Sequence, residues 1–182
     1  YINHQVMAKP GLLGELDFFS VLEPGLPYQP WTRPDWAWPG TLWPAFEALA
    51  CAQAQSAEAA WGMSWALRHA LFAQARPISL RHELLAIATE VAAEVPLNLA
   101  RFEADWDNGC YKRNVIAESK RGWHELKLNG SATFVLPGGR HITNPGVGQL
   151  DFDEATCTVR SYTPYPGNAL ALYREMLGSV HG

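Results

Sequence analysis

The chain has 182 residues, of which 48% are hydrophobic, and it carries a formal net charge of -4. A chain of this length can bury a sizeable core as one domain, or as one domain with a large insertion. It has no cluster of lysine and arginine, which argues against a nucleic-acid surface and against a polybasic membrane patch. No apolar run approaches the roughly 20 residues that cross a bilayer, and the first residues lack the layout of a secretory signal, so we expect a cytoplasmic protein.

The spacing of cysteine and histidine does not fit the common disulfide and zinc motifs. Cys51, Cys110 and Cys157 are far apart, and none of them belongs to a Cys-x-x-Cys pair. Three cysteines at such spacing make a poor disulfide framework. His82-Glu83 begins like a helical zinc motif, but Ala86 stands where the second histidine is needed. We therefore expect no metal ion and no cofactor.

The first forty residues show little regular pattern. Residues 2–8 predict a short strand because polar and apolar residues roughly alternate. Between Glu23 and Pro44 the chain holds six prolines and four tryptophans, which excludes a regular helix or a central strand over most of the segment. We expect an extended meander whose indoles form a lid over the helices that follow. The alternative is a stacking platform for a sugar or a flat cofactor.

The alanine-rich region from Thr41 to Val95 predicts three helices. Thr41 is expected to cap the first helix, with Leu42, Phe46 and Leu49 on its apolar face. The second helix, at about residues 57–75, is apolar on two sides, which is typical of a helix in the centre of a bundle. Trp61, Trp65 and Phe72 lie on one of these sides. Ser79 is expected to cap the third helix, which has the most regular apolar stripe in the chain: Leu80, Leu84, Ile87, Val91 and Val95.

Strand patterns return only after two further predicted helices. Asn98 begins a short helix that ends at Asn108-Gly109, and a charged helix follows over residues 111–125. Residues 133–136, a Pro-Gly-Gly turn and residues 140–143 then predict a β-hairpin. Residues 168–177 predict a closing helix that directs four side chains inward, namely Leu170, Tyr173, Met176 and Leu177.

This order of elements is that of the second half of a thioredoxin fold with an inserted helical domain. Three segments carry the likeness: "ALRHALFAQARPISLRHELLAIATEV" at 66–91, "LARFEADWDNG" at 99–109 and "NGSATFVLPGGRHITNPG" at 129–146. Over roughly residues 41–146 the chain resembles the DsbA-like family of thiol–disulfide oxidoreductases. The resemblance implies an α/β (α+β) chain with a thioredoxin-like fold. Its parts would be a strand and Pro/Trp-rich meander at 1–40, a helical insertion domain at 41–109 and the C-terminal half of the thioredoxin-like domain at 110–182.

The corner Ser131-Ala132-Thr133 corresponds to the family's substrate-binding loop. Members of the family place a cis-proline just before this strand, beside the redox cysteines and the bound substrate chain. Ala132 stands where that proline is expected. A cis bond before a non-proline residue costs about 3–4 kcal/mol, so we expect a trans peptide before Ala132 and a reshaped corner. By this resemblance, Ser131, Ala132 and Thr133 are the substrate-binding residues.

The family's Cys-x-x-Cys motif is missing from the sequence. In such enzymes it stands at a helix N-terminus, where the helix dipole and the neighbouring thiol lower the pKa of the nucleophile. In the family the motif belongs to a βα unit that precedes the position of residues 2–8. Here that unit either lies outside the chain or has been lost in evolution.

Among the cysteines present, Cys110 is the best candidate for a reactive thiol, because it stands at the predicted start of a helix. A structural role is the competing interpretation for it. Cys51, on a predicted helix, and Cys157, in an irregular or edge-strand stretch, are expected to be structural. His69, His82 and His124 lie on charged helix faces and are expected to be solvated surface groups, while His141 lies next to the hairpin strand.

Three functions are compatible with these features. The first is thiol–disulfide exchange on a protein or small-thiol disulfide, if a Cys-x-x-Cys segment exists outside the chain. The second is a degenerate, non-catalytic binding module. The third is a glutathione-dependent isomerase or transferase of the hydroxychromene-carboxylate isomerase type, in which a serine replaces the first cysteine. An exposed sheet edge also favours a homodimer.

Overall fold

The computed structural model describes residues 9–128, 130 and 132–178. The strand expected at residues 2–8 and the candidate residue Ser131 lie outside these ranges. The chain divides into two compact units, one ending at Ser119 and the other beginning at Lys120. Helices and strands both occur, so the expected mixture of α and β structure is confirmed.

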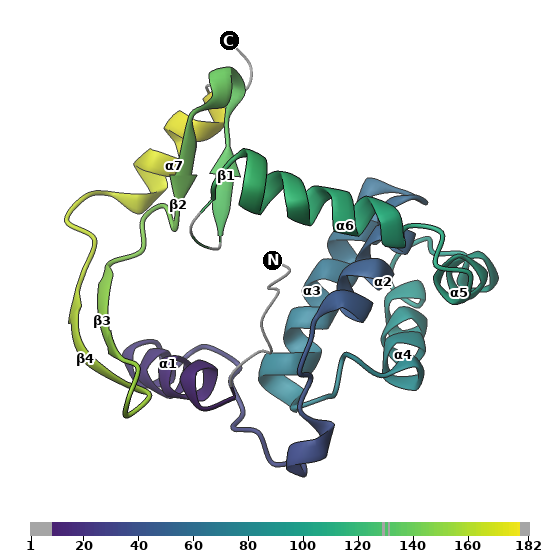
Figure 1. Ribbon diagram of the computed structural model, residues 1–182, viewed down its shortest axis with the longest axis horizontal. Coiled ribbons are helices and arrows are strands. Elements are labelled where there is room, and N and C mark those ends of the chain that lie inside the picture. The colour runs from purple at the N-terminus through teal and green to yellow at the C-terminus, as the bar shows by residue number, and fades with distance from the viewer. Residues whose placement is uncertain (1–8, 129, 131, 179–182) are drawn as a thin grey trace. The chain divides into compact units, whose positions relative to one another are not determined.

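The helices and strands follow one another as Figure 1 labels them. The first unit holds α1 (Lys9–Leu22), α2 (Trp43–Gln53), α3 (Ala57–Gln74), α4 (Arg81–Ala92), α5 (Leu99–Asp107) and nearly all of α6 (Lys112–Lys120). The second unit holds a π-helical turn (Arg121–Glu125), β1 (Thr133–Val135), β2 (His141–Thr143), β3 (Gln149–Asp153), β4 (Thr158–Thr163) and α7 (Ala169–Gly178).

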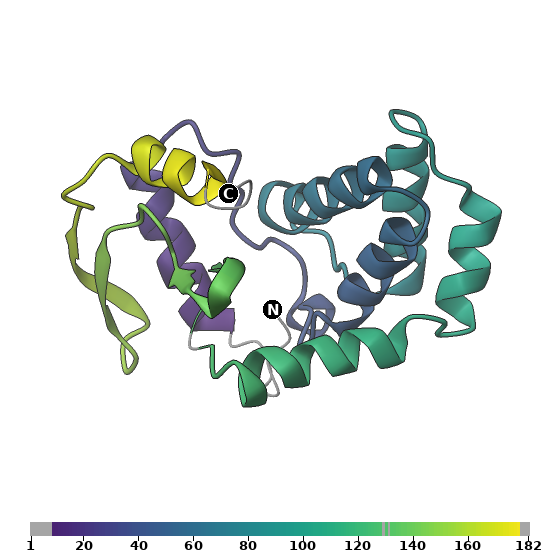
Figure 2. The ribbon, with the colours of Figure 1, turned by 90° about the horizontal axis from the view of Figure 1, so that it is seen from above.

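The core of the first unit lies between α2, α3, α4 and α5, which form one cluster in both ribbon views (Figures 1 and 2). Most of the side chains that α2 buries are small. They are Ala45, Ala48, Cys51 and Ala52, with Glu47 beside them. The leucine and phenylalanine face predicted for this helix is only half-buried. Alanines let the neighbouring helices approach closely, and that contact decides which face of α2 is buried.

The outer face of α3 corrects the prediction of a helix buried on two sides. Met63, Leu67 and Leu71 are in the core, as expected for one face of an amphipathic helix. Trp61 and Trp65, however, are 76% and 66% exposed. The helical spacing of aromatic residues does not by itself show whether the face that carries them is buried or exposed to solvent.

The helix termini show which capping predictions hold. Asn98 caps α5 through its side chain, which accepts a hydrogen bond from the N–H of Arg101 at 3.0 Å, as predicted. Ser56 caps α3 in the same way. The prediction for Ser79 is wrong, because Leu80 is the N-cap of α4 and makes no side-chain cap bond. Leu42 likewise replaces Thr41 as the N-cap of α2, although the Thr41 hydroxyl accepts a long bond from the N–H of Trp43 at 3.3 Å.

Helix α1 was not predicted from the sequence. At 100° per residue, its apolar residues are spread around the helix axis, so the segment has no continuous polar face to reveal a helical period. They are Leu12, Leu13, Leu16, Phe18, Phe19, Val21 and Leu22. None of its residues is fully buried.

The segment between α1 and α2 is extended as predicted, apart from a turn at residues 24–25 and a 3-10 turn at Asp35–Ala37. It runs along the C-terminal end of α3. The Gln29 N–H donates to the Phe72 carbonyl at 2.8 Å, and the Arg33 Nε–H donates to the Ala75 carbonyl at 2.8 Å. Trp31 and Trp38 meet edge to face, with ring centroids 5.0 Å apart. Trp36 is 80% exposed, so only part of the expected lid of indoles covers apolar surface.

The predicted hairpin of the second unit is confirmed. β1 and β2 are antiparallel, with Thr133 opposite Thr143 and Val135 opposite His141. Helix α7 lies beside this hairpin (Figure 1), where the rings of Phe134 and Tyr173 are 6.2 Å apart, edge to face. Of the four side chains expected to point inward from α7, only that of Met176 is buried. The prediction is wrong for Leu170 and Leu177, which are 58% and 65% exposed.

A second hairpin, β3–β4, forms where an irregular or edge-strand stretch was expected around Cys157. It pairs Gln149 with Thr163 at one end and Asp153 with Thr158 at the other. Its turn contains no glycine or asparagine, and Cys157 adopts the left-handed conformation, with φ 54°, that those residues would favour. The usual sequence signal for a hairpin is therefore absent.

The described strands form two separate two-stranded sheets, β1-β2 and β3-β4. A thioredoxin fold has one central sheet to which both of its halves contribute strands. The mixed α and β class is therefore established, and the thioredoxin-like fold stays a prediction.

The left-handed residue in the second hairpin gives a test of this unit. We expect Cys157→Gly to stabilise the β3–β4 hairpin by about 0.5–1 kcal/mol, because glycine adopts positive φ without steric cost. Hydrogen exchange of the amides in β3 and β4 would measure the gain. Cys157→Ala keeps the strained backbone and should give no such protection. Equal exchange rates in the two variants would contradict the argument.

Candidate functional site

The residues around Ala132 and Thr133 form a hydrogen-bonded corner at the start of β1. The Thr133 hydroxyl donates to the Gly130 carbonyl at 2.7 Å and lies 2.8 Å from the Thr143 hydroxyl. Since a hydroxyl has one proton, the Thr143 hydroxyl is the donor in the second bond. Cross-strand pairing of Thr133 with Thr143 thus fixes the Thr133 side chain against the loop that precedes it.

Two further residues give the corner its backbone shape. A Cβ at Gly130 would lie 2.7 Å from the Cγ2 of Thr143, so a side chain at this position would clash. Asn144 has a φ of 47°, which asparagine tolerates better than most residues, and its N–H donates to the Ala132 carbonyl at 2.7 Å. Glycine and asparagine therefore allow the loop and the strand to meet in a tight corner.

The outer edge of β1 presents backbone groups to solvent. In an antiparallel pair, alternate residues direct their N–H and C=O groups toward the partner strand. The bonds from Asn144 N–H to Ala132 O and from Leu136 N–H to Arg140 O identify the even-numbered residues as those that face β2. Thr133 and Val135 therefore direct their backbone groups away from β2, and no other described strand pairs with β1.

Apolar side chains accompany this free edge. Phe134 and Val135 are 41% and 46% exposed, and Ala132 is also exposed. An edge strand with unpaired backbone groups and exposed apolar side chains is able to receive another extended chain. Among the described residues of the corner, Thr133 and Thr143 carry hydroxyls and none carries a thiol, so strand addition is the chemistry that these residues support.

The structure places two of the three predicted substrate-binding residues, Ala132 and Thr133, at this corner. The peptide bond before Ala132 involves Ser131, so its expected trans state lies outside the described residues. Sequence reasoning missed Gly130, Thr143 and Asn144. The register of the predicted hairpin contained the signal for Thr143, because a turn centred on Pro137-Gly138-Gly139 puts Thr133 and Thr143 opposite each other.

Cys51 is a buried structural residue, as expected. Its exposed fraction is 1%. Burial raises the pKa of the Cys51 thiol to about 12, and the nearby charges of Asp105, Cys110 and Glu47 act in the same direction. The protonated thiol is neither a nucleophile nor a metal ligand.

The raised pKa predicts a loss of stability in alkaline solution. The folded state holds the Cys51 proton more tightly than the unfolded chain does, so this contribution is complete below pH 9 and decreases as the pH rises toward 12. Denaturant unfolding between pH 8 and 11 would measure it. Cys51→Ala should reduce this alkaline slope, and an unchanged slope would contradict the assignment.

Cys110 is exposed and lies in the turn between α5, which ends at Asp107, and α6. Its N–H donates to the Asp105 carbonyl at 2.9 Å, and α6 begins only at Lys112. Cys110 thus stands two residues before the first residue of α6, and its reactivity stays a prediction. Cys157 is half-buried in the β3–β4 turn, with its Sγ 3.6 Å from the Glu154 carbonyl. All three cysteines are free thiols.

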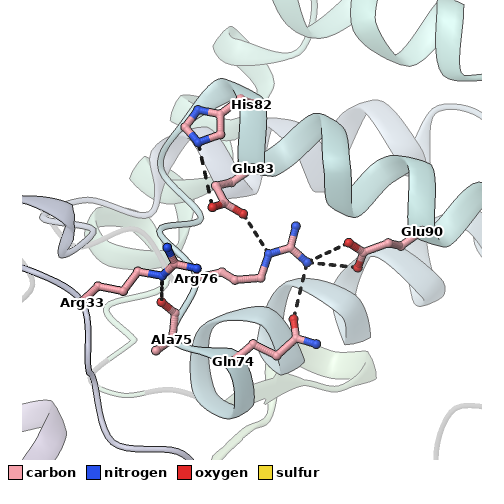
Figure 3. A network of polar contacts seen from close by, with 7 residues as sticks. All are labelled: Arg33, Gln74, Ala75, Arg76, His82, Glu83 and Glu90. Carbon is pink, nitrogen blue, oxygen red and sulfur yellow. Dashed lines mark hydrogen bonds and ion pairs between the residues drawn. The ribbon is translucent and has the colours of Figure 1, made fainter.

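The densest polar network of the first unit joins α3 to α4 around Arg76 (Figure 3). The Arg76 Nε lies 2.8 Å from a Glu83 carboxylate oxygen, and its Nη1 lies 2.9 Å from Glu90. Burial alone lowers the pKa of Arg76, but hydrogen bonds with both carboxylates outweigh it and leave the pKa raised. Every charge of this network has a partner, so we interpret it as structural.

Three further observations concern the histidines, metal ligands and helix lengths of the described residues. His69, His82, His124 and His141 are all exposed. Within the described ranges, no group of three or more histidine, cysteine or acidic side chains is arranged to hold a metal ion. None of the described helices is both long and apolar enough to cross a bilayer.

The chain has no significant match to any protein-family model, curated protein or solved structure. Its function therefore has to be argued from its own residues.

Proposed function

We propose that this chain is part of a DsbA-like thiol–disulfide oxidoreductase in which the corner of Ala132 and Thr133 forms the substrate side of the active site. The observation that carries the proposal is the free outer edge of β1, directly after this corner. The order of a helical unit, the β1–β2 hairpin and a closing helix also supports it, although the separate β3–β4 hairpin stands between that hairpin and α7.

The redox cysteines of this proposal lie in a Cys-x-x-Cys segment outside residues 1–182. Cys51 is buried, Cys110 lies in the turn between two helices and Cys157 lies in a hairpin turn, so none of them forms a dithiol centre. In the βα unit that carries the motif, the strand would pair with the outer edge of β1. Thr133 and Val135 offer the backbone groups for that pairing.

The proposed reaction exchanges two electrons and two protons between an enzyme dithiol and a substrate disulfide. A thiolate of the Cys-x-x-Cys segment attacks one sulfur of a substrate disulfide, and the other substrate sulfur leaves as a thiolate that takes up a proton. The second cysteine then attacks the mixed disulfide and releases the reduced substrate. The enzyme dithiol is thereby oxidised to a disulfide, and the reverse sequence forms a disulfide in the substrate.

The upstream reading frame and the mass of the native protein test the proposal together. We expect an intact mass above 20.2 kDa, a Cys-x-x-Cys in the additional residues, and reduction of insulin disulfides by the full protein. If the upstream reading frame holds no such segment and the full protein does not reduce insulin, the proposal is wrong. A serine in place of the first cysteine would favour the glutathione-dependent isomerase type instead.

A variant of the full protein tests the role of the corner. Thr133→Val deletes the hydroxyl that bonds to Gly130 and Thr143, and we expect turnover of a protein substrate to fall about tenfold, since such a bond contributes about 1 kcal/mol and its loss leaves a partner unpaired. Thr158→Val, in the β3–β4 hairpin, is the matched control and should leave turnover unchanged. If the two substitutions reduced turnover equally, the corner would not be part of the substrate-binding site.

A binding module without catalysis is the second candidate function. It is favoured by the absence of a thiol from the described corner, together with the exposed side chains of Phe134 and Val135 beside an unpaired strand edge. Such a module would hold an extended peptide by strand addition, or pair two copies of the chain. This function would be identified if the protein bound unfolded polypeptide but did not reduce insulin disulfides.

A further inference from the structure

The outer face of α3 carries two neighbouring tryptophans that the other described residues leave uncovered. Trp61 and Trp65 are four residues apart, so their side chains lie one turn apart on the same face of the helix. They are 76% and 66% exposed. Single exposed apolar side chains are ordinary on a protein surface, but two adjacent indoles form a continuous apolar patch. This face is therefore a candidate interaction surface.

Opposite charges stand at the two ends of this tryptophan patch. Glu58 lies in the first turn of α3, three residues before Trp61, and Arg68 lies three residues after Trp65. Both charged residues are exposed. Arg68 donates to the Ser64 carbonyl at 2.8 Å and also to the Ser64 hydroxyl. Among the described residues, neither Glu58 nor Arg68 forms an ion pair, so both charges are available to a partner.

The two tryptophans and the two charged residues are arranged symmetrically about one point of the helix. Trp61 and Trp65 each stand two residues from Met63, on opposite sides of it. Glu58 and Arg68 each stand five residues from it in the same manner. Met63 has an exposed fraction of 0%, so its side chain points into the core. At about 100° per residue, the four flanking residues lie within about 40° of the direction opposite Met63, in a symmetric pattern.

A twofold axis through this point makes the patch complementary to itself. When two copies of α3 lie antiparallel across such an axis, residues at equal distances before and after Met63 come together. Trp61 of each copy then faces Trp65 of the other, and Glu58 of each copy faces Arg68 of the other. Each contact occurs twice, so the pairing covers four indoles and forms two ion pairs. A second copy of the chain thus already carries the complementary charges at the required spacing.

The size of the patch predicts a weak association. A fully covered tryptophan buries about 150–250 Å², so four indoles exposed to this extent contribute roughly 400–700 Å² to the interface. Interfaces that bury less than about 1,200 Å² are typical of weak, transient complexes. We therefore expect a reversible dimer with a dissociation constant in the high-micromolar range.

From this combination we propose that two copies of the chain associate through the outer faces of their α3 helices, in an antiparallel, twofold-symmetric pair centred at Met63. The indoles form the apolar centre of the interface, and Glu58 and Arg68 close it at both ends. This inference does not depend on the proposed redox function, because the α3 face and the corner share no residue. It also differs from the pairing of two chains along β1.

Charge reversal tests the pairing directly. Sedimentation velocity of the unmodified chain between about 10 µM and 1 mM should show reversible dimerisation. Glu58→Arg and Arg68→Glu each place like charges opposite one another at both ends of the interface, and we expect each to weaken the dimer about tenfold. A mixture of the two variants brings opposite charges together again and should restore dimerisation. Glu58→Arg/Arg68→Glu in one chain exchanges the two charges and should also restore it.

Control variants separate the α3 face from other surfaces. Glu154→Arg makes the same charge change at an exposed position in the β3–β4 turn and should leave dimerisation unchanged. Trp65→Ser should weaken the dimer by more than about tenfold, whereas Trp36→Ser removes an indole that is 80% exposed outside the patch and should have no effect. A monomer at every concentration would overturn the inference. So would a dimer that Glu58→Arg does not weaken, or a failure of the mixed variants to restore it.

Discussion

Replacement of Phe102 by alanine is expected to destabilise the first unit by about 3–5 kcal/mol. Among the described residues, Phe102 is the largest fully buried side chain, with an exposed fraction of 0%, and it belongs to the core cluster between α2 and α5. Its removal loses the transfer free energy of an aromatic ring and leaves a cavity. The surrounding helices can fill that cavity only by moving together.

Urea unfolding followed by circular dichroism measures this loss without relying on tryptophan emission. Trp36→Ala is the matched control, because it also truncates a large aromatic side chain, but one that is 80% exposed. We expect the control to change the free energy of unfolding by about 0.5 kcal/mol or less. A loss below about 1 kcal/mol for Phe102→Ala would mean that α5 does not contribute to a common core.

Elements with a clear period or a glycine turn were predictable from the sequence. The stripe from Leu84 to Val91 in α4, the asparagine cap of α5 and the Pro-Gly-Gly hairpin each combine a pattern with a local signal. The hairpin is also what made part of the candidate corner predictable. Its register follows from the turn, and the register decides which residues lie opposite each other.

The errors have identifiable physical causes. Helix α1 has apolar residues around its whole circumference, so the helical period is hidden. The β3–β4 turn forces Cys157 into a conformation that its side chain disfavours, so the composition of the turn gives no signal. Trp61 and Trp65 form a regular apolar face that neighbouring described elements leave exposed. In each case the information lies in tertiary contacts, which local patterns do not contain.

The polar part of the corner illustrates the same limit. The sequence identified Thr133 but not the role of Gly130, which appears only because the Thr143 side chain lies where a Cβ would be. The ion-pair partners of Arg76 were equally unpredictable from the sequence. Arg76 follows the end of α3 in the sequence, yet its partner Glu83 stands in the first turn of α4 and its partner Glu90 near the other end of that helix.

Removal of Arg76 is expected to have the largest electrostatic effect in the chain. The Arg76 and Glu83 side chains are 13% and 14% exposed, and the ion pair between them is 2.8 Å long. Arg76→Ala leaves the carboxylate of Glu83 without its main partner at a largely buried position. Breaking a buried pair in this way costs about 3–5 kcal/mol, whereas replacing both partners by apolar residues is often neutral. We therefore expect Arg76→Met/Glu83→Leu to recover most of the stability that Arg76→Ala loses.

Arg81 provides the matched control, because it also joins α4 to acidic residues. It contacts Glu103 and Asp107 at 2.6 Å, but these three side chains are 42–51% exposed. Solvent screens such pairs, so Arg81→Ala should cost much less stability than Arg76→Ala, and 1 M salt should abolish most of that loss. Urea unfolding of the variants at low and high salt distinguishes the two cases. If Arg76→Ala and Arg81→Ala lost similar, salt-sensitive amounts, burial would not be what gives the Arg76 network its strength, and the attachment of α3 to α4 would have to come from the apolar core alone.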